Sequence, residues 1–292
     1  MADNYNLWPN CLFDSHCHLD LALRKLPVKR YSDSSIAHTV HWDGQGTELH
    51  HMGGLITNMC YPNRWPTERV LSTRPSKVHI SVGVHPKQAN LLTPLNVEKL
   101  ERLVRGGNVV AMGECGLDYS RSGWKNWRMQ ETTFLTQLEM AMKYDLPVIV
   151  HAREAEDELY KLLAKAGVPR NWPIHRHCFT ENWVSADRWL TTYPASKIGL
   201  TALVTYPHAT SVRDVALHIP LTRLLLETDA PYFPPKNRVL MSRSFQSSYS
   251  LPSHVLQVAS EVAMIKQCDI GAVLNSNLKN VADIYRIQTN YY

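Results

Sequence analysis

The sequence predicts a parallel α/β barrel, because short apolar segments typical of strands alternate with amphipathic segments typical of helices. Eight strand-like segments can be counted along the 292 residues. An eight-stranded α/β barrel typically needs about 250 residues, so the length also fits. An open, doubly wound sheet is the alternative, since the periodicity of the sequence does not distinguish the two arrangements.

The predicted strands are apolar or rich in β-branched residues, and Gly, Pro, Asn or Asp bound them. They span residues 12–19, 55–61, 78–85, 109–117, 147–152, 173–179, 197–204 and 224–228. No internal repeat or linker interrupts this series, so we expect residues 1–292 to form a single domain. Two long segments, 24–52 and 231–251, show neither pattern, and long loops of this kind are often functional.

Helices are predicted where apolar residues recur with a helical period. One covers 128–144, and the next covers 155–166, where Gly167 is a suitable C-cap. Another is expected over 180–193, beginning at Thr180 and ending before Pro194. Two more follow the last strand, at 253–265 with Ser253 as N-cap and at 269–285.

The composition narrows the class of protein. With 44% hydrophobic and 20% charged residues, the chain can bury a large core, which excludes a disordered protein or a coiled coil. No apolar run reaches the ~20 residues of a membrane span, and the N-terminus lacks the pattern of a secretory signal. Six cysteines without a C-x-x-C pair predict reduced thiols and an intracellular protein, cytoplasmic or nuclear. The net charge of +5 is compatible with a phosphate-bearing partner without identifying one.

Metal-binding residue types recur at the ends of the predicted strands. His16 and His18 are two residues apart on the first strand, so their side chains point the same way. In a parallel barrel the carboxyl ends of all the strands meet at one mouth, where catalytic groups lie. Six residues are therefore expected to converge there: His16, His18, Glu114, His151, His177 and Asp229.

A metal centre is the simplest explanation for this convergence, because buried carboxylates without a cation would repel one another. Imidazole and carboxylate ligands without a thiolate cluster suit Zn²⁺, Mn²⁺, Fe²⁺ or Co²⁺, and Mg²⁺ if waters complete its shell. Six ligands exceed the needs of one catalytic ion, so two ions sharing Glu114 fit better. Cys17, Cys115 and Cys178 adjoin ligand positions, and strand alternation predicts that they point away from the centre.

Five short motifs, taken together and in this order, are highly specific. They are FDSHCHLD at 13–20, VHP at 84–86, GECGLDY at 113–119, HCFT at 177–180 and ETDAPY at 227–232. In these motifs the chain resembles the TatD-like metal-dependent deoxyribonucleases, which belong to the amidohydrolase-type TIM barrels. Two segments depart from the family pattern, the long 24–52 stretch and the residues after Pro234. Both are expected beside the mouth, where they would affect substrate preference.

The resemblance implies a metal-dependent phosphodiesterase, typically a 3′ exonuclease on DNA, with RNA as a second substrate. Position by position, it implies that His16, His18, Glu114 and Asp229 bind one ion, and that Glu114, His151 and His177 bind the other. Mg²⁺ or Mn²⁺ would serve in catalysis, with Zn²⁺ as an alternative. The expected partner is nucleic acid rather than a membrane, and we expect a monomer.

The proposed chemistry is hydrolysis by a metal-activated water, with Asp229 as general base and Glu114 between the ions. Glu227 lies two residues before Asp229 and is expected to orient a histidine ligand. Five residues near the ligands are expected to contact substrate: His85 and the cations Arg121 and Arg153 at phosphate, and the rings of Tyr119 and Tyr232 at a base.

Three other functions are compatible with the same barrel. A small-molecule amidohydrolase or lactonase is one, although many such sites use a bridging lysine where this chain offers Glu114. An aminoacyl-tRNA deacylase could use the same activated water. A nucleic-acid-binding barrel without catalysis is the third, and the complete ligand set argues against it.

Overall fold

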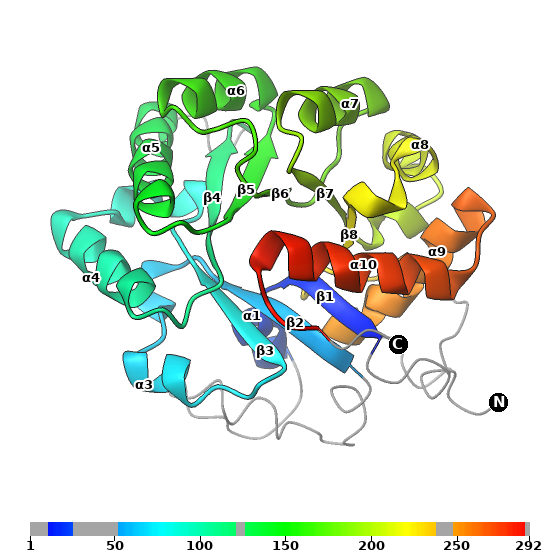
Figure 1. The fold of residues 1–292 in the computed structure, drawn as a ribbon, viewed down its shortest axis with the longest axis horizontal. Coiled ribbons are helices and arrows are strands. Elements are labelled where there is room, and N and C mark those ends of the chain that lie inside the picture. The colour runs from blue at the N-terminus through cyan, green and yellow to red at the C-terminus, as the bar shows by residue number, and fades with distance from the viewer. Residues whose placement is uncertain (1–10, 26–51, 121–125, 238–247, 290–292) are drawn as a thin grey trace.

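The structure, a computed structural model, describes residues 11–25, 52–120, 126–237 and 248–289. An eight-stranded parallel sheet forms its centre, with the strands in sequence order and helices outside them (Figure 1). The strands are β1 (Leu12–Cys17), β2 (Met52–Met59), β3 (Val78–Val82), β4 (Ala111–Asp118), β5 (Val148–Arg153), β6 (Ile174–Arg176), β7 (Lys197–Leu200) and β8 (Leu224–Leu226). The predicted barrel is confirmed.

The helices follow the strands in alternation. They are α1 (Leu19–Lys25), α3 (Glu68–Ser72), α4 (Pro94–Arg105), α5 (Trp127–Lys143), α6 (Glu156–Lys165), α7 (Trp183–Thr192), α8 (Thr210–His218), α9 (Val255–Lys266) and α10 (Ile270–Tyr285). Short 3₁₀ turns lie between them, among them Pro86–Leu91, Ala202–Thr205 and Pro252–His254. Among the described residues, none of these helices combines the length and the apolar character that a bilayer crossing requires.

The two ends of the sheet meet through hydrogen bonds between β1 and the segment that follows β8. The amide of Asp229 donates to the carbonyl of His16 at 2.9 Å, and the amide of His18 donates to that of Ala230 at 2.7 Å. Below them, the Asn277 side chain on α10 accepts from the amide of Leu226 and donates to the carbonyl of Phe13, both at 2.8 Å. The helix α10, red in Figure 1, thereby ties the first strand to the last.

The predicted strand ends need correction, because several strands are shorter than their apolar sequences. β6 ends at Arg176, β7 at Leu200 and β8 at Leu226. The apolar character continues because the loops beyond these strands are themselves buried: Phe179 is 1% exposed and Ala202 is fully buried. Burial and strand geometry therefore end at different residues.

Two predicted helix starts are wrong. The helix α7 begins after Asn182, whose side chain accepts from the amide of Ser185 at 3.0 Å, and not at Thr180. Ser253 is not an N-cap but lies inside the 3₁₀ turn that precedes α9. The helices α1, α3, α4 and α8 were not predicted. For α4 the signal was present, since Thr93 caps it through the amide of Asn96 and Pro94 occupies its first turn.

Candidate metal centre

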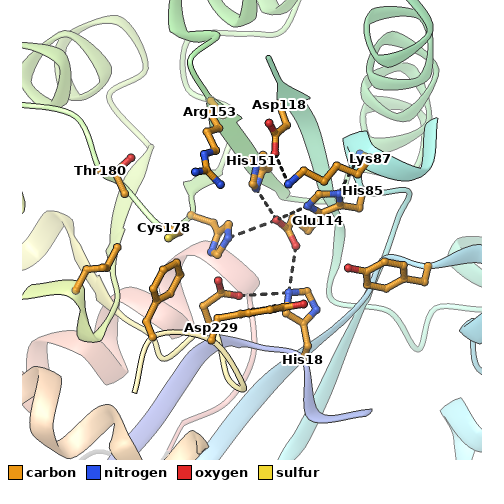
Figure 2. Close-up of a pocket in the computed structure, with 16 residues that line it drawn as sticks. His18, His85, Lys87, Glu114, Asp118, His151, Arg153, Cys178, Thr180 and Asp229 are labelled. Carbon is orange, nitrogen blue, oxygen red and sulfur yellow. Dashed lines mark hydrogen bonds and ion pairs between the residues drawn. The ribbon is translucent and has the colours of Figure 1, made fainter. Parts of the chain in front are cut away.

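The six predicted ligands all come together at the mouth of the barrel, although they belong to five different strand regions. His16 lies on β1, with His18 one residue past its end, and Glu114 lies in the middle of β4. His151 lies on β5, and His177 and Asp229 follow β6 and β8 directly or within three residues. Figure 2 shows the Glu114 carboxylate at the centre of the imidazoles.

The two oxygens of Glu114 face two different sets of side chains. Its Oε2 lies 3.3 Å from His18 Nε2 and 3.7 Å from His16 Nε2. Its Oε1 lies 2.7 Å from His151 Nδ1 and 3.4 Å from His177 Nε2. A carboxylate that presents one oxygen to each set is arranged to bridge two cations.

Asp229 completes the first of these sets. Its Oδ1 lies 3.3 Å from His18 Nε2 and 3.6 Å from His16 Nε2. Glu114 Oε2 and Asp229 Oδ1 thus both face His16 and His18, whereas Glu114 Oε1 faces His151 and His177. The grouping at Glu114 matches the division that the family resemblance implies. The two sets adjoin, because ligand atoms of His16, His177 and Asp229 also lie within 4.8 Å of one another.

Contacts at the far ring nitrogens orient two of these histidines toward the centre. His18 Nδ1 lies 3.2 Å from the carbonyl of Asn58, to which it can donate only as an N–H. His177 Nδ1 lies at an ion-pair distance of 3.3 Å from Glu227 Oε1, a contact that also favours a proton on Nδ1. In a neutral imidazole the Nε2 lone pair is then free, and that nitrogen is the one turned toward Glu114.

His85 reaches the same carboxylate with the opposite tautomer. Its Nδ1 accepts a hydrogen bond from the amide of Lys87 at 3.0 Å, so in the neutral ring the proton is on Nε2. That nitrogen lies 3.6 Å from Glu114 Oε1. Burial, which outweighs the attraction of Glu114, lowers the pKa of His85 to about 3 and keeps the ring neutral. His85 is therefore placed as a hydrogen-bond donor rather than as a metal ligand.

A glycine allows β4 to approach β5 closely enough to bring Glu114 to His151. Gly116 has a φ of +143°, and a Cβ there would lie 1.9 Å from the carbonyl oxygen of His151. No side chain fits this space. Gly116 is paired with His151 in the ladder between the two strands, two residues from Glu114.

The electrostatics of the centre favour a cation. Burial by itself would raise the pKa of Glu114, but the imidazoles of His85, His177 and His151 outweigh it and hold the pKa well below its usual value. Burial likewise disfavours the charged form of His177, but Glu227 and Glu114 raise its pKa to about 10. In this arrangement the imidazolium of His177 supplies positive charge that a divalent ion would supply when bound.

The residues present fit divalent metal ions. Ligand atoms of His16, His18 and Glu114 lie within 4.8 Å of one another, as do those of His16, His177 and Asp229. Within the described part of the chain, His16 Nε2 and Asp229 Oδ1 are buried and have no hydrogen-bond partner. Buried polar atoms normally have partners, so these two are explained if a cation binds between them.

A pocket of about 470 Å³ opens above the centre, and both cationic and aromatic residues line it. Lys87, Arg153 and Thr180 are among its polar residues, and Tyr61, Tyr232 and Phe233 are its aromatic ones other than histidine. Lys87 Nζ pairs with Asp118 Oδ2 at 3.0 Å, whereas the Arg153 guanidinium has no carboxylate partner among the described residues. Figure 2 shows Arg153 and Lys87 on the same side as His151 and Asp118.

The structure brings most of the predicted substrate residues to this pocket, with two exceptions. His85, Arg153 and Tyr232 line it. Tyr119 does not line it, because its hydroxyl donates to Glu131 on α5 at 3.0 Å and turns the ring away. Arg121 lies outside the described residues.

The prediction for Cys178 is wrong. Cys17 and Cys115 donate to the carbonyls of Ile56 and Ile149, away from the centre. Cys178 lies beyond the end of β6 with a φ of +44° and lines the pocket, because strand alternation no longer applies there. Sequence reasoning also missed Cys60, whose Sγ lies 3.7 Å from Glu114 Oε2. It follows β2 directly, which is the signal that could have found it.

An eight-stranded parallel barrel with imidazoles and carboxylates gathered at its mouth defines a metal-dependent hydrolase of the TIM-barrel class. The family model described as TatD related DNase matches residues 13–286. The chain belongs to this TatD-related family, and its chemistry is accordingly metal-dependent hydrolysis of phosphodiester bonds.

Three known proteins illustrate the similarity. The human 3′-5′ RNA nuclease TATDN2 is 30% identical over 279 residues, covering 94% of this chain, which spans only 35% of that protein's length. The 3′-5′ ssDNA/RNA exonuclease TatD from a Pantoea species is 32% identical over 206 residues, with 70% and 78% of the two chains covered. The crystal structure of YjjV from Escherichia coli superposes with a TM-score of 0.75 at 25% identity, covering 96% and 99% of the two chains.

Proposed function

We propose that this chain is a nuclease that removes nucleotides from the 3′ end of single-stranded DNA, and of RNA as a second substrate, with two divalent ions at the barrel mouth. The observation that carries the proposal is the position of Glu114. Its two oxygens divide the ligands into one set with Asp229 and another with His151. Two relatives that are named as 3′-5′ nucleases support the direction of cleavage.

Mg²⁺ or Mn²⁺, with Zn²⁺ as the alternative, suits a donor set of imidazoles and carboxylates without thiolates. One ion would be held by His16, His18, Glu114 and Asp229, and the other by Glu114, His151 and His177. When bound, the ions would supply the Lewis acidity that activates water and offsets the negative charge of the phosphoryl group. We also propose that the chain acts as a monomer.

Asp229 is the residue that takes up the proton of the attacking water. It is 7% exposed at the wall of the pocket, and its Oδ1 has no hydrogen-bond partner among the described residues. A carboxylate within reach of both the water and the ligand set can act as a general base. Glu114 lies between the two ligand sets and contacts both. Glu227 orients His177 through the contact between Glu227 Oε1 and His177 Nδ1.

The cationic residues that line the pocket bind the phosphate to be cleaved. His85 presents Nε2–H beside Glu114, and Arg153 presents paired N–H donors that match two phosphate oxygens. Lys87 adds a point charge from the same side, partly offset by Asp118. Together these donors would hold a phosphodiester against the ligand sets.

The aromatic residues that line the pocket bind the base of the terminal nucleotide. Tyr232 is 46% exposed, and its ring lies 6.5 Å from that of Phe233, measured between centroids. Exposed rings beside a cationic patch are typical of single-strand binding, since each stacked base contributes about 1–3 kcal/mol without reading its identity. A pocket of this size accommodates an end of a strand better than a duplex.

A cleavage assay on end-labelled strands tests the proposal. Single-stranded DNA and RNA labelled at the 5′ or the 3′ end are incubated with the protein and Mg²⁺, Mn²⁺ or EDTA. We expect a ladder from the 5′ label, immediate release of mononucleotide from the 3′ label, and no product in EDTA. A cyclic amide, a lactone and an aminoacyl-tRNA, assayed in parallel, test the other hydrolase activities.

Matched carboxylate variants connect the activity to the centre. Glu114→Gln and Asp229→Asn are expected to lower kcat by at least about a thousandfold, because each removes an interaction with the reacting groups. Asp157→Asn, at an 81% exposed side chain that does not line the pocket, should cleave at the parent rate. Cleavage by the Glu114→Gln variant at the parent rate, or no cleavage of any strand by the parent with either metal, would contradict the proposal.

A further inference from the structure

A row of buried polar groups leads from the C-terminal helix to the metal ligand His177. The hydroxyl of Tyr285, the last residue of α10, lies 2.5 Å from His175 Nδ1. The other nitrogen of that ring, Nε2, lies 2.9 Å from Glu227 Oε2. Glu227 Oε1 in turn lies 3.3 Å from His177 Nδ1. Tyr285 is 3% exposed, His177 is 2% exposed, and the two residues between them are fully buried.

Glu227 contacts both rings at ion-pair distance, and no hydrogen bond of regular geometry reaches His175 Nε2, Glu227 Oε2 or His177 Nδ1 from the described residues. These buried atoms therefore have only each other as partners, and one distribution of protons suits their contacts. Glu227 as a carboxylate only accepts, so the ring nitrogen of His175 that faces it must carry the proton. In the neutral ring Nδ1 is then an acceptor, and the hydroxyl of Tyr285 donates to it. The alternative acceptor for this hydroxyl, the carbonyl of Ser15, is 3.5 Å away.

The same count fixes the tautomer of the metal ligand. Glu227 Oε1 already accepts from the amide of Cys178 at 2.5 Å. With His175 held as a donor on its Oε2, Glu227 stays an acceptor toward His177, so the neutral ring that binds a metal ion keeps its proton on Nδ1. The Nε2 lone pair of His177 is left for the centre, where it faces Glu114 at 3.4 Å.

The barrel leaves room for this row at a glycine. A Cβ at Gly199 on β7 would lie 2.4 Å from His175 Nε2 and 2.6 Å from Glu227 Oε2. The two side chains therefore meet across β7, in space that any other residue would fill. Three strands and one helix contribute to a contact that serves neither the apolar core nor the pocket.

We propose that Tyr285 and His175 are positioning residues, which act through Glu227 to hold the Nε2 of His177 toward the ion that it shares with Glu114 and His151. The inference rests on the proposed two-ion centre. Outer partners of metal ligands typically change metal affinity by about 10- to 100-fold. Because Tyr285 acts through two intervening groups, its effect should be smaller than that of His175.

Metal titration of variants measures this role. Calorimetry with Mn²⁺ is performed on the metal-free parent and on Tyr285→Phe, His175→Leu and His175→Gln. We expect one of two binding steps to weaken, by about 3-fold in Tyr285→Phe and about 10-fold or more in His175→Leu, while the other step stays unchanged. His175→Gln retains an N–H donor for Glu227 and should recover part of the affinity. General loss of structure would weaken both steps equally.

A matched control removes a different buried hydroxyl. Tyr160 is 8% exposed and its hydroxyl has no hydrogen-bond partner among the described residues, so Tyr160→Phe should bind Mn²⁺ like the parent. Parent-like binding in both Tyr285→Phe and His175→Leu would overturn the proposal. A third binding step that His175→Leu abolishes would also overturn it, because His16, His175 and Glu227 would then hold an ion themselves.

A second readout separates this inference from the proposed function. Proton and nitrogen chemical shifts of the metal-free protein report the Nδ1–H group of His177, assigned with a His177→Asn variant. We expect a slowly exchanging Nδ1–H signal in the parent, where the group faces Glu227, and a faster-exchanging signal in Tyr285→Phe. If the parent binds no metal but this signal still depends on Tyr285, the two-ion function is wrong and the positioning role stands. An unchanged signal in Tyr285→Phe refutes the role whatever the metal result.

Discussion

Replacing Arg176 with Met should destabilise the protein by about 3–5 kcal/mol, because the substitution breaks a buried ion pair and leaves its partner unpaired. Arg176 is fully buried on β6, next to the ligand His177. Its Nε and Nη2 donate to Glu156 Oε1 at 3.0 and 2.5 Å. It also donates to the carbonyls of His177 and Ala152, at 2.5 and 2.9 Å, and so joins the ends of β5 and β6.

The magnitude follows from burial rather than from distance. Arg188 Nη1 contacts Asp157 Oδ1 at the same 2.5 Å, but these side chains are 48% and 81% exposed. In the buried pair the corresponding figures are 0% for Arg176 and 15% for Glu156. An exposed pair contributes about 0–1 kcal/mol, so Arg188→Met should change the stability little. Methionine replaces the apolar stem and removes the charge in both variants, so the burial of the lost ion pair is the main difference between them.

Urea unfolding followed by circular dichroism measures both free energies. A double variant, Arg176→Met with Glu156→Gln, removes the unpaired charge but keeps an acceptor for the Trp189 indole, which donates to Glu156 at 2.9 Å. It should recover part of the lost stability. The reasoning is refuted if Arg176→Met stays within about 1 kcal/mol of the parent, or if Arg188→Met loses as much.

Three further predictions concern pH, metal and substrate. Burial lowers the pKa of His254 from 6.5 to about 4. Between these pH values the unfolded chain binds a proton at His254 that the folded chain does not bind, so acidification destabilises the folded state. At pH 5 this costs about 2 kcal/mol of stability, and the loss on acidification in urea titrations should shrink by that amount in His254→Gln. Mn²⁺ at 100 times its Kd should stabilise the parent by about 2.7 kcal/mol, reversibly with EDTA; an equal gain in Glu114→Gln would argue against the centre. Arg153→Met should raise the KM for single-stranded DNA about tenfold with kcat nearly unchanged, and an unaltered KM would exclude its role at phosphate.

The sequence was informative about the site because a parallel barrel converts strand ends into neighbours. His16 and Asp229 are far apart in the chain, yet His16 lies near the end of β1 and Asp229 follows β8, and all such strand ends meet at one mouth. The fold class and the family were therefore predictable from local patterns and motifs. Helices α1, α3 and α8 were not predicted, since they are short and have few buried residues.

Predictions failed where a side chain's direction depends on contacts beyond its own strand. Cys178 turns into the pocket because its backbone has a positive φ after β6 has ended. Tyr119 turns away from the pocket because its hydroxyl donates a hydrogen bond to Glu131 on α5. In both cases the alternation rule of a regular strand stops applying one or two residues beyond the strand.

By itself, the sequence determined which chemical groups reach the mouth, because strand order and period place them there without reference to any other part of the fold. Tertiary structure alone decided how those groups are oriented. His177 faces Glu227, which contacts His175, which in turn contacts Tyr285, a residue 110 positions from His175 in the chain. Contacts between distant side chains follow from three-dimensional packing, and no local pattern of residues encodes them.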